Sequence, residues 1–304
     1  MPRYPSTVMV TVVCPWDDHE RLAEDVFRRE IRDAVAKGFR RIYVFGTAGE
    51  GYAVDTERFT RVLEVFGDEL LGTETTPMVG VIGLSTGNVL ERLRIARDLG
   101  FRDFQISLPS WSALSDAEVL QYFVEIAGTF PDSSFMHYNT VRSRRVLTGT
   151  EYRWLSEAVP NLVATKIISS DLKVVSSAVR DAPELMHFLA ETTIAHGSLY
   201  GQCALLGTYG ILAPKRSWAL LEAVQAGRFR EAAEIGSWFD SVSRDVLEPL
   251  FADVRVDGAY DKVIAKLGGV EDLPLRMLSP YRTVSDDEFE RTRQLLRELH
   301  PECE

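Results

Sequence analysis

The run LVATKII, residues 162–168, is an apolar segment that contains one lysine, Lys166. Turn-forming residues flank it (PN before, SSD after), and a short apolar run in that setting is typical of a fully buried parallel strand. A buried ammonium group is unfavourable unless it is paired or loses its proton, and a neutral lysine can form a Schiff base with a carbonyl compound. Alternatively, Lys166 lies at a strand end with its stem packed and its ammonium group in water.

Strand and helix patterns alternate on both sides of this run. Apolar, largely β-branched segments predict eight strands, at residues 7–14, 41–45, 78–82, 103–108, 134–138, 162–168, 184–189 and 209–213. Amphipathic or capped segments predict a helix after each, at residues 21–37, 55–71, 88–99, 115–128, 149–159, 171–179, 193–206 and 217–226. Eight such units most simply form a closed (β/α)8 TIM barrel of parallel strands. A doubly wound open sheet is the alternative, but no GxGxxG motif follows the first strand.

The pattern changes after residue 227, where only helices are predicted. They span residues 228–246, 257–266 and 285–300, with a proline-containing connector at 272–281. The sequence SDDE at 285–288 matches a capping box at the start of the last helix. We therefore expect a catalytic barrel at residues 1–226 and a C-terminal helical region, residues 227–304, packed on it.

Composition limits the classes of function. The chain of 304 residues is 45% hydrophobic and 26% charged, as in ordinary globular proteins, and its net charge of −11 argues against a nucleic-acid partner. Its three cysteines and five histidines form neither CxxC nor HExxH, which argues against a disulfide framework and a metal site. No apolar stretch is long enough to span a bilayer and no signal-peptide pattern is present, so we expect a cytoplasmic protein without a membrane partner.

The ends of the predicted strands carry the candidate site, because barrel active sites lie at the C-terminal ends of the strands. Lys166 and Tyr138 end neighbouring strands, and if both face inward the phenol can shuttle protons during Schiff-base chemistry. GTAGE, residues 46–50, follows the second strand and can bind an anion through backbone amides and the Thr47 hydroxyl. Together these features predict a 2-oxo acid substrate. Alternatively, Tyr138 only packs, the loop is merely flexible, and Glu50 caps the next helix or pairs with backbone amides.

These motifs, in this order, resemble the dihydrodipicolinate synthase / N-acetylneuraminate lyase family of class I aldolases and synthases. The resemblance covers nearly the whole chain. It rests on VCPW at 13–16, GTAGE at 46–50, YN at 138–139, ATK at 164–166 with SSDL at 169–172, and PLR at 274–276. It implies a (β/α)8 barrel that uses no metal or organic cofactor and assembles as a homo-oligomer, usually a tetramer built as a dimer of dimers.

The resemblance also implies roles for individual residues. Lys166 would form the Schiff base with pyruvate or a related 2-oxo acid, and Tyr138 would shuttle protons. Thr47 would hydrogen-bond Tyr138 or the substrate carboxylate, which the backbone at Ala48 and Gly49 would also bind. The imine would serve as an electron sink for cleavage, condensation or loss of water next to the carbonyl.

Four positions depart from the family pattern. Ala48 replaces a hydroxyl residue of the loop, and Trp111 stands where the synthases have a tyrosine that relays protons. Arg142 or Arg144 is a candidate for binding substrate, but the family's sequence frame around its arginine is missing. Glu191 and its neighbours fit the polyol-binding pattern of the sialic acid lyases poorly. The departures argue against both dihydrodipicolinate synthase and sialic acid lyase activity.

We therefore expect a Schiff-base lyase, aldolase or hydro-lyase acting on a 2-oxo acid. Pro-x-Trp at 109–111 resembles the hydratase-aldolases of arylidene-pyruvates, in which Trp111 would wall in an apolar or aromatic second substrate; alternatively, Trp111 packs at a subunit interface.

Two alternatives remain open. The first is a sugar-acid (2-keto-3-deoxy acid) aldolase or dehydratase, whose hydroxyl groups would bind to Glu191, Thr192 and Thr193. The second belongs to another class, a non-catalytic 2-oxo acid binding protein, which the presence of Lys166 and Tyr138 disfavours.

Overall fold

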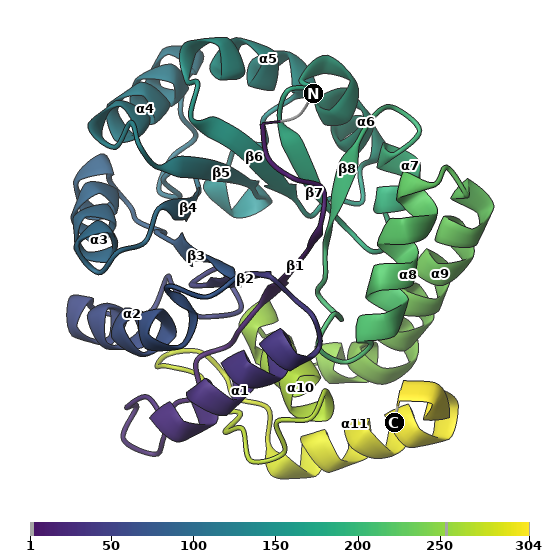
Figure 1. Cartoon of the computed structure of the whole chain (residues 1–304). Coiled ribbons are helices and arrows are strands. Elements are labelled where there is room, and N and C mark those ends of the chain that lie inside the picture. Colours follow the sequence, from purple (N-terminus) through teal and green to yellow (C-terminus); the bar gives the residue numbers. More distant parts are fainter. Residues whose placement is uncertain (1–2, 253–254, 304) are drawn as a thin grey trace.

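A computed structural model describes residues 3–252 and 255–303, and it confirms the (β/α)8 barrel (Figure 1). The strands are parallel and close in chain order, with β1 paired to both β2 and β8. The strands are β1 (Val8–Thr11), β2 (Arg41–Val44), β3 (Thr76–Gly80), β4 (Asp103–Ile106), β5 (Ser134–Asn139), β6 (Leu162–Ile167), β7 (Met186–Ala190) and β8 (Cys203–Leu206). The helices between and after them are α1 (Glu24–Ala36), α2 (Thr56–Leu70), α3 (Thr86–Asp98), α4 (Asp116–Thr129), α5 (Gly149–Ala158), α6 (Leu172–Asp181), α7 (Ile194–Gly197) and α8 (Pro214–Gln225).

Alternate residues of the strands fill the barrel interior, as the two-residue period of a strand requires. The interior forms a separate apolar cluster: Tyr4, Met9, Tyr43, Met78, Met136, Val163, Ala164, Met186, Phe188, Ala204 and Leu206. The N-terminal end is closed by polar contacts, since Tyr4 donates a hydrogen bond to Asp103 (3.0 Å) and accepts one from Arg41 (2.8 Å). The open end of the barrel is therefore at the C-terminal ends of the strands.

The eighth strand is not where the sequence predicts it. The prediction of a strand at 209–213 and of a helix over 193–206 is wrong: α7 ends at Gly197, and CALL, Cys203–Leu206, forms β8. A four-residue apolar run suits either structure by periodicity alone. Its hydrogen-bonded pairing with β7 and β1 makes it a strand. All four residues pair with β7, and Leu205 and Leu206 pair with β1. Consequently Thr208 and Tyr209, rather than residues 212–214, follow the C-terminal end of β8.

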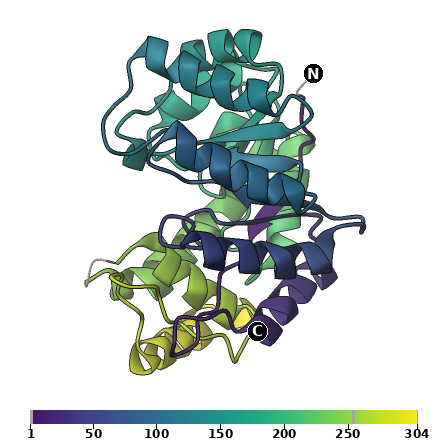
Figure 2. The ribbon, with the colours of Figure 1, turned by 90° about the vertical axis from the view of Figure 1, so that its left-hand side faces the viewer.

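The C-terminal helices pack around the barrel: the first of them lies beside α8, and the later two lie near α1 (Figures 1 and 2). They are α9 (Phe229–Val242), a π-helical turn (Ser243–Leu247), a 3-10 turn (Glu248–Ala252), α10 (Asp257–Leu267), α11 (Asp286–Leu299) and a last 3-10 turn (Pro301–Cys303). The predicted capping box is confirmed, because Ser285 and Glu288 exchange side-chain and backbone hydrogen bonds at the start of α11. The expected boundary at residue 226 falls between α8 and α9, and apolar residues from both sides of it share one hydrophobic cluster. In residues 3–252 and 255–303, no helix is long and apolar enough to cross a membrane.

α10 lies directly on the loop that follows β2. A Cβ atom at position 258 would stand only 2.9 Å from the carbonyl oxygen of Thr47, so the contact requires glycine there. One turn further along the same face, Lys262 forms an ion pair with Glu50 (2.6 Å). The two contacts fix α10 over the open end of the barrel, where it completes the wall of the site described next.

Candidate active site

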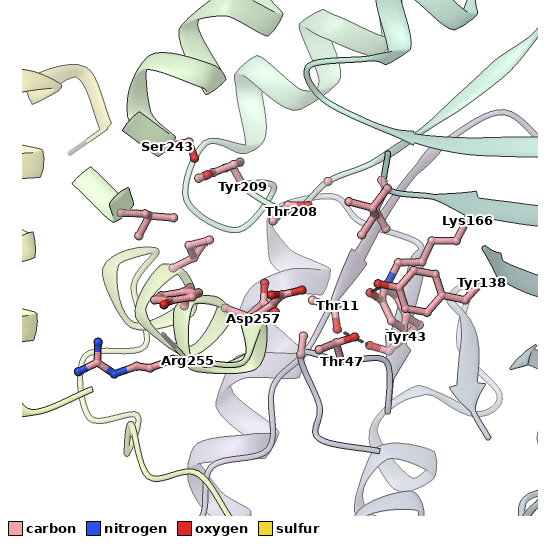
Figure 3. A pocket seen from close by; sticks show the side chains of 18 residues that line it. Thr11, Tyr43, Thr47, Tyr138, Lys166, Thr208, Tyr209, Ser243, Arg255 and Asp257 are labelled. Atoms are coloured by element: carbon pink, nitrogen blue, oxygen red, sulfur yellow. Dashed lines mark hydrogen bonds between the residues drawn. The ribbon is translucent and has the colours of Figure 1, made fainter. Parts of the chain in front are cut away.

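A cavity of about 540 Å³ opens at the C-terminal ends of the strands (Figure 3). Strands and the loops after them supply one part of its wall, and the C-terminal helices supply the other. The barrel contributes Thr11, Tyr43, Thr47, Ala48, Tyr138, Lys166, Ile168, Leu206, Gly207, Thr208 and Tyr209. The C-terminal part contributes Ser243, Leu247, Arg255, Asp257, Tyr260, Asp261 and Ile264.

Lys166 lies at the inner end of this cavity and is only 2% exposed. Its Nζ donates a hydrogen bond to the phenol of Tyr43 (2.6 Å) and lies 4.2 Å from the ring centre of Tyr138. Burial lowers the pKa of the amine, while the charge of Tyr138 and of Asp261 acts in the opposite direction. No ion pair holds Lys166 in the part of the chain that the structure describes. The amine therefore has a larger neutral fraction than a surface lysine, and this is the form that attacks a carbonyl.

Tyr43 is the contact that sequence reasoning missed. It lies on β2, and burial raises the pKa of its phenol, with the charge of Asp261 adding to the effect. The phenol therefore stays protonated and can both accept a hydrogen bond from the amine and donate one. The two-residue period of RIYVF does place position 43 on one face, but an apolar run without polar alternation gives no sign of which face is inward.

Tyr138 and Lys166 are register partners on β5 and β6, so their side chains lie at the same height in the barrel. Thr47 and Ala48 reach the same cavity from the loop after β2. Gly49 lies behind them: a Cβ there would come within 2.6 Å of the Phe45 amide nitrogen, so this close turn requires glycine. The structure thus brings Lys166, Tyr138, Thr47 and Ala48 together, with Gly49 shaping the loop.

Glu50 belongs to a buried polar cluster rather than to the cavity lining. One carboxylate oxygen accepts a hydrogen bond from the Trp16 indole (2.8 Å) and pairs with Lys262, and the other accepts one from the Leu278 amide (2.8 Å). Glu50 is fully buried and does not cap α2, where Asp55 is the capping residue. The cluster fastens the loop at 46–50 to the C-terminal part of the chain.

Trp111, Arg144 and Arg142 lie outside the cavity lining, but Arg142 is near enough for its positive charge to help lower the pKa of the Lys166 amine. Trp111 is 84% exposed on the loop after β4, and Arg144 donates a hydrogen bond to the carbonyl of Ser110 (3.1 Å) on the same loop. Arg142 is about half exposed and donates to the carboxylate of Asp257 (2.8 Å), at the outer part of the cavity. None of the three is among the residues that line the cavity, although Arg142 binds one that is.

Glu191 is buried beside the loop after β8. Its carboxylate accepts a hydrogen bond from the Tyr209 amide (2.9 Å), and burial raises the pKa of the acid to about 7 against the opposing effect of that hydrogen bond. Glu191 therefore holds the loop that carries Thr208 and Tyr209 into the cavity. Those two residues were missed because the eighth strand was expected several residues later.

The cavity-facing side of α10 was also missed at the sequence level. Asp257, Tyr260, Asp261 and Ile264 all line the cavity and follow the helical spacing of one face. That spacing was visible in the sequence, but nothing in it shows that this face meets the barrel. Among residues 3–252 and 255–303, no group of three or more His, Cys, Asp or Glu side chains could hold a metal ion.

A buried amine beside two phenols, at the open end of a (β/α)8 barrel, is the arrangement of a class I lyase of the aldolase type. The family model for the dihydrodipicolinate synthetase family matches residues 4–299, and the chain belongs to this family.

Relatives with different activities match the chain about equally well. A 4-hydroxy-tetrahydrodipicolinate synthase of Thermus thermophilus is 28% identical over 223 residues, which cover 71% of this chain and 73% of that protein. An N-acetylneuraminate lyase of Citrobacter koseri is 25% identical over 231 residues, covering 75% of this chain and 77% of the relative.

Among solved structures, YagE, a prophage protein of the dihydrodipicolinic acid synthase family from E. coli K12, was crystallised with pyruvate. It superposes with a TM-score of 0.85 at 17% identity and covers 97% of this chain and 98% of its own. At this identity the match supports the fold alone.

Proposed function

We propose that this protein is a Schiff-base-forming lyase that acts on pyruvate or a related 2-oxo acid. The observation that carries the proposal is Lys166, a buried amine with a lowered pKa, bonded to a neutral phenol and open to a cavity. The family and the pyruvate bound to YagE support the choice of substrate class.

The arrangement suggests a sequence of steps. The substrate carboxylate would bind to the Thr47 hydroxyl and to the backbone amides at Ala48 and Gly49, which presents the ketone carbon to the amine. Lys166 would attack that carbon, and Tyr138 would deliver the proton with which the carbinolamine oxygen leaves as water. The resulting iminium draws electrons from the neighbouring carbon, so a bond there can break or form.

The second substrate is proposed to be apolar or aromatic, as in the hydratase-aldolases. The support is the outer cavity wall, where Tyr209, Leu247, Tyr260 and Ile264 offer apolar surface and aromatic rings. In this proposal Trp111, exposed on the loop after β4, adds a further aromatic wall.

A sugar-acid aldolase or dehydratase is the second candidate. Its support comes from different groups of the same wall, the hydroxyls of Thr208 and Ser243 and the carboxylates of Asp257 and Asp261. These groups could bind the hydroxyls of a 2-keto-3-deoxy acid, with Glu191 holding the loop that carries Thr208. Arg142 would neutralise Asp257 in either case.

Reductive trapping tests the proposal. The protein is incubated with pyruvate and borohydride, and its mass is compared with that of Lys166→Met under the same conditions. We expect one adduct in the wild type and none in the variant, and an unmodified wild-type protein would refute the Schiff base. A panel of aldehydes with pyruvate, such as benzaldehyde and glyceraldehyde, then separates the two candidates for the second substrate.

Assembly as a homo-oligomer, a tetramer by resemblance, is also proposed. Large apolar side chains are exposed on the loops after β3, β4 and β5: Leu84, Trp111 and Val141. Such side chains in one region are typical of surfaces buried by association. Sedimentation velocity of the wild type and of Trp111→Ala tests this. A wild type that is monomeric at every concentration would contradict the proposal.

A further inference from the structure

Asp261 is an acidic side chain that the steps above do not use. It projects from α10 into the cavity that Lys166 lines. In the described part of the chain no hydrogen bond or ion pair holds its carboxylate, whereas Asp257, one turn earlier, is bound by Arg142 (2.8 Å). The side chain is partly exposed, at the cavity, and a partly desolvated carboxylate without a partner is unfavourable. No contact of the Asp261 carboxylate stabilises the fold in the described residues, which points to a role in the reaction.

The position of Asp261 is fixed by contacts on both sides of the residue in α10. Gly258 packs against the carbonyl of Thr47, and Lys262 is bonded to Glu50. Because these contacts attach α10 to the loop that would bind the substrate carboxylate, Asp261 and that loop form one rigid unit. A side chain held in this way can act on a defined atom of the substrate.

The charges around Asp261 suit a base. Burial raises its pKa to about 7, with a smaller contribution from Asp257, and the positive charges of Lys166 and Arg142 act in the opposite direction. An acid with a pKa near the working pH can take up a proton and return it in one cycle.

The other groups in reach are less suited to accept a proton from carbon. The phenol of Tyr43 is bonded to the amine and its pKa is raised by burial, so it is a poor proton acceptor at neutral pH. Asp257 is neutralised by Arg142, and Glu191 is occupied by the Tyr209 amide. Asp261 is left as the carboxylate that lines the cavity together with Lys166 and acts on its charge.

We propose that Asp261 is the base that removes a proton from C3 of the 2-oxo acid bound to Lys166. The inference rests on the proposed Schiff base. The carboxylate takes the proton, the C3–H electron pair forms the C2=C3 double bond, and the C2=N pair moves onto nitrogen and neutralises the iminium. The product is an enamine, and protonated Asp261 returns a proton to C3 in the reverse step. Tyr138 acts at the C2 oxygen and Asp261 at C3, so the two proton transfers have separate groups.

Deuterium exchange into pyruvate tests this without knowledge of the second substrate. In D2O the wild type should exchange the methyl protons of pyruvate for deuterium, because the enamine is deuterated at C3. Proton NMR follows the loss of the methyl signal. Asp261→Asn should slow this exchange by ~10²–10⁴-fold, the range for loss of general acid–base help. It should still give the borohydride adduct, since imine formation needs only Lys166 and Tyr138. Asp98→Asn, at an exposed position of α3, is the matched control and should exchange at the wild-type rate.

The exchange rate and the adduct together show whether Asp261 is the base. Exchange at the wild-type rate in Asp261→Asn would overturn the assignment, as would a wild-type protein that forms the adduct but exchanges no protons. Loss of the adduct in Asp261→Asn would place the residue in imine formation and overturn it equally. Asp261→Glu keeps an acid in the cavity and should exchange faster than Asp261→Asn; equal rates would contradict the proposal even if the asparagine variant were poorly folded. A wild type without any adduct would instead refute the proposed function.

Discussion

The protein contains two buried lysines, Lys166 and Lys262, whose partners differ. Lys166 is 2% exposed and Lys262 is fully buried, and burial lowers the pKa of both amines. Lys262 is bonded at 2.6 Å to the carboxylate of Glu50, whose charge favours the protonated amine, and it also donates to the carbonyl of Arg276. Lys166 is bonded at the same distance to the phenol of Tyr43, and a cavity adjoins it.

The partner, rather than burial, separates the two roles. A carboxylate at contact distance compensates the ammonium charge, so Lys262 serves as a cation that ties α10 to the loop after β2. A phenol cannot supply that charge, so Lys166 loses its proton more readily and the cavity gives a carbonyl access to it. Changes at Lys262 or its partner Glu50 should therefore affect stability, and changes at Lys166 or its partner Tyr43 should affect the chemistry.

Replacing Lys166 should have the largest effect on activity. Lys166→Met removes the nucleophile and should abolish turnover of any 2-oxo acid, while methionine fills the volume without a buried charge and keeps the fold. Lys173→Met, at an exposed position of α6, is the control and should retain full activity. Activity assays combined with urea unfolding separate the two effects, and turnover in Lys166→Met would contradict the assignment.

Replacing Lys262 should have the largest effect on stability. Lys262→Met leaves Glu50 as a buried carboxylate without its cation, which costs about 3–5 kcal/mol of the free energy of unfolding. The double variant Lys262→Met/Glu50→Gln removes the stranded charge and should regain part of that loss. Urea unfolding curves measure both, and a single variant as stable as the wild type would show that the pair does not hold the loop to α10.

Tyr138→Phe should lower turnover by ~10²–10⁴-fold, because the proton on the carbinolamine oxygen would then come from water. The borohydride adduct should still form, at a reduced rate. Single-turnover measurements of adduct formation are the check, and an unchanged rate would remove Tyr138 from the proton path.

Tyr43→Phe should have a smaller effect, on the pH dependence of adduct formation. Its phenol accepts a hydrogen bond from the Lys166 amine, which favours the ammonium form, so its loss should lower the pKa of the amine further. A hydrogen bond to a charged group contributes about 1.5–3 kcal/mol, so the acid limb of adduct formation should move to lower pH by about one unit or more. The rate of adduct formation as a function of pH measures this. A limb that stays in place, or moves to higher pH, would contradict it.

Trp111→Ala should have the smallest effect on the common chemistry. The indole is exposed and away from the amine, so the pyruvate adduct should form as in the wild type while the preference among aldehydes changes. The aldehyde panel measures that preference. Loss of the adduct itself would mean that Trp111 supports the core of the site.

The sequence predicted the parts of the site that depend on short-range patterns. Strand period and chain order were enough to place Lys166 beside Tyr138, because neighbouring strands in a barrel end at the same height. The β8 prediction failed because CALL is too short for periodicity to distinguish helix from strand.

Contacts between distant segments could not be read from the pattern. Glu50 was interpreted as a helix cap or a partner of backbone amides; the second holds for the Leu278 amide, but neither that partner nor Lys262 could be named, because both lie far along the chain. The polar face of α10 was visible as a helical stripe, but its position over the amine depends on how Gly258 packs against the loop after β2. Local sequence therefore pointed to Lys166, the proposed nucleophile, and tertiary packing supplied the groups around it.

The comparison of the two lysines is tested most directly by mapping the site of reductive trapping. The wild-type protein is treated with pyruvate and borohydride, digested, and its lysine-containing peptides are analysed by mass spectrometry. We expect the adduct on Lys166 and an unmodified Lys262, although both amines are buried. No adduct, or an adduct on Lys262 in place of Lys166, would contradict the claim that the phenol-bonded lysine at the cavity is the nucleophile.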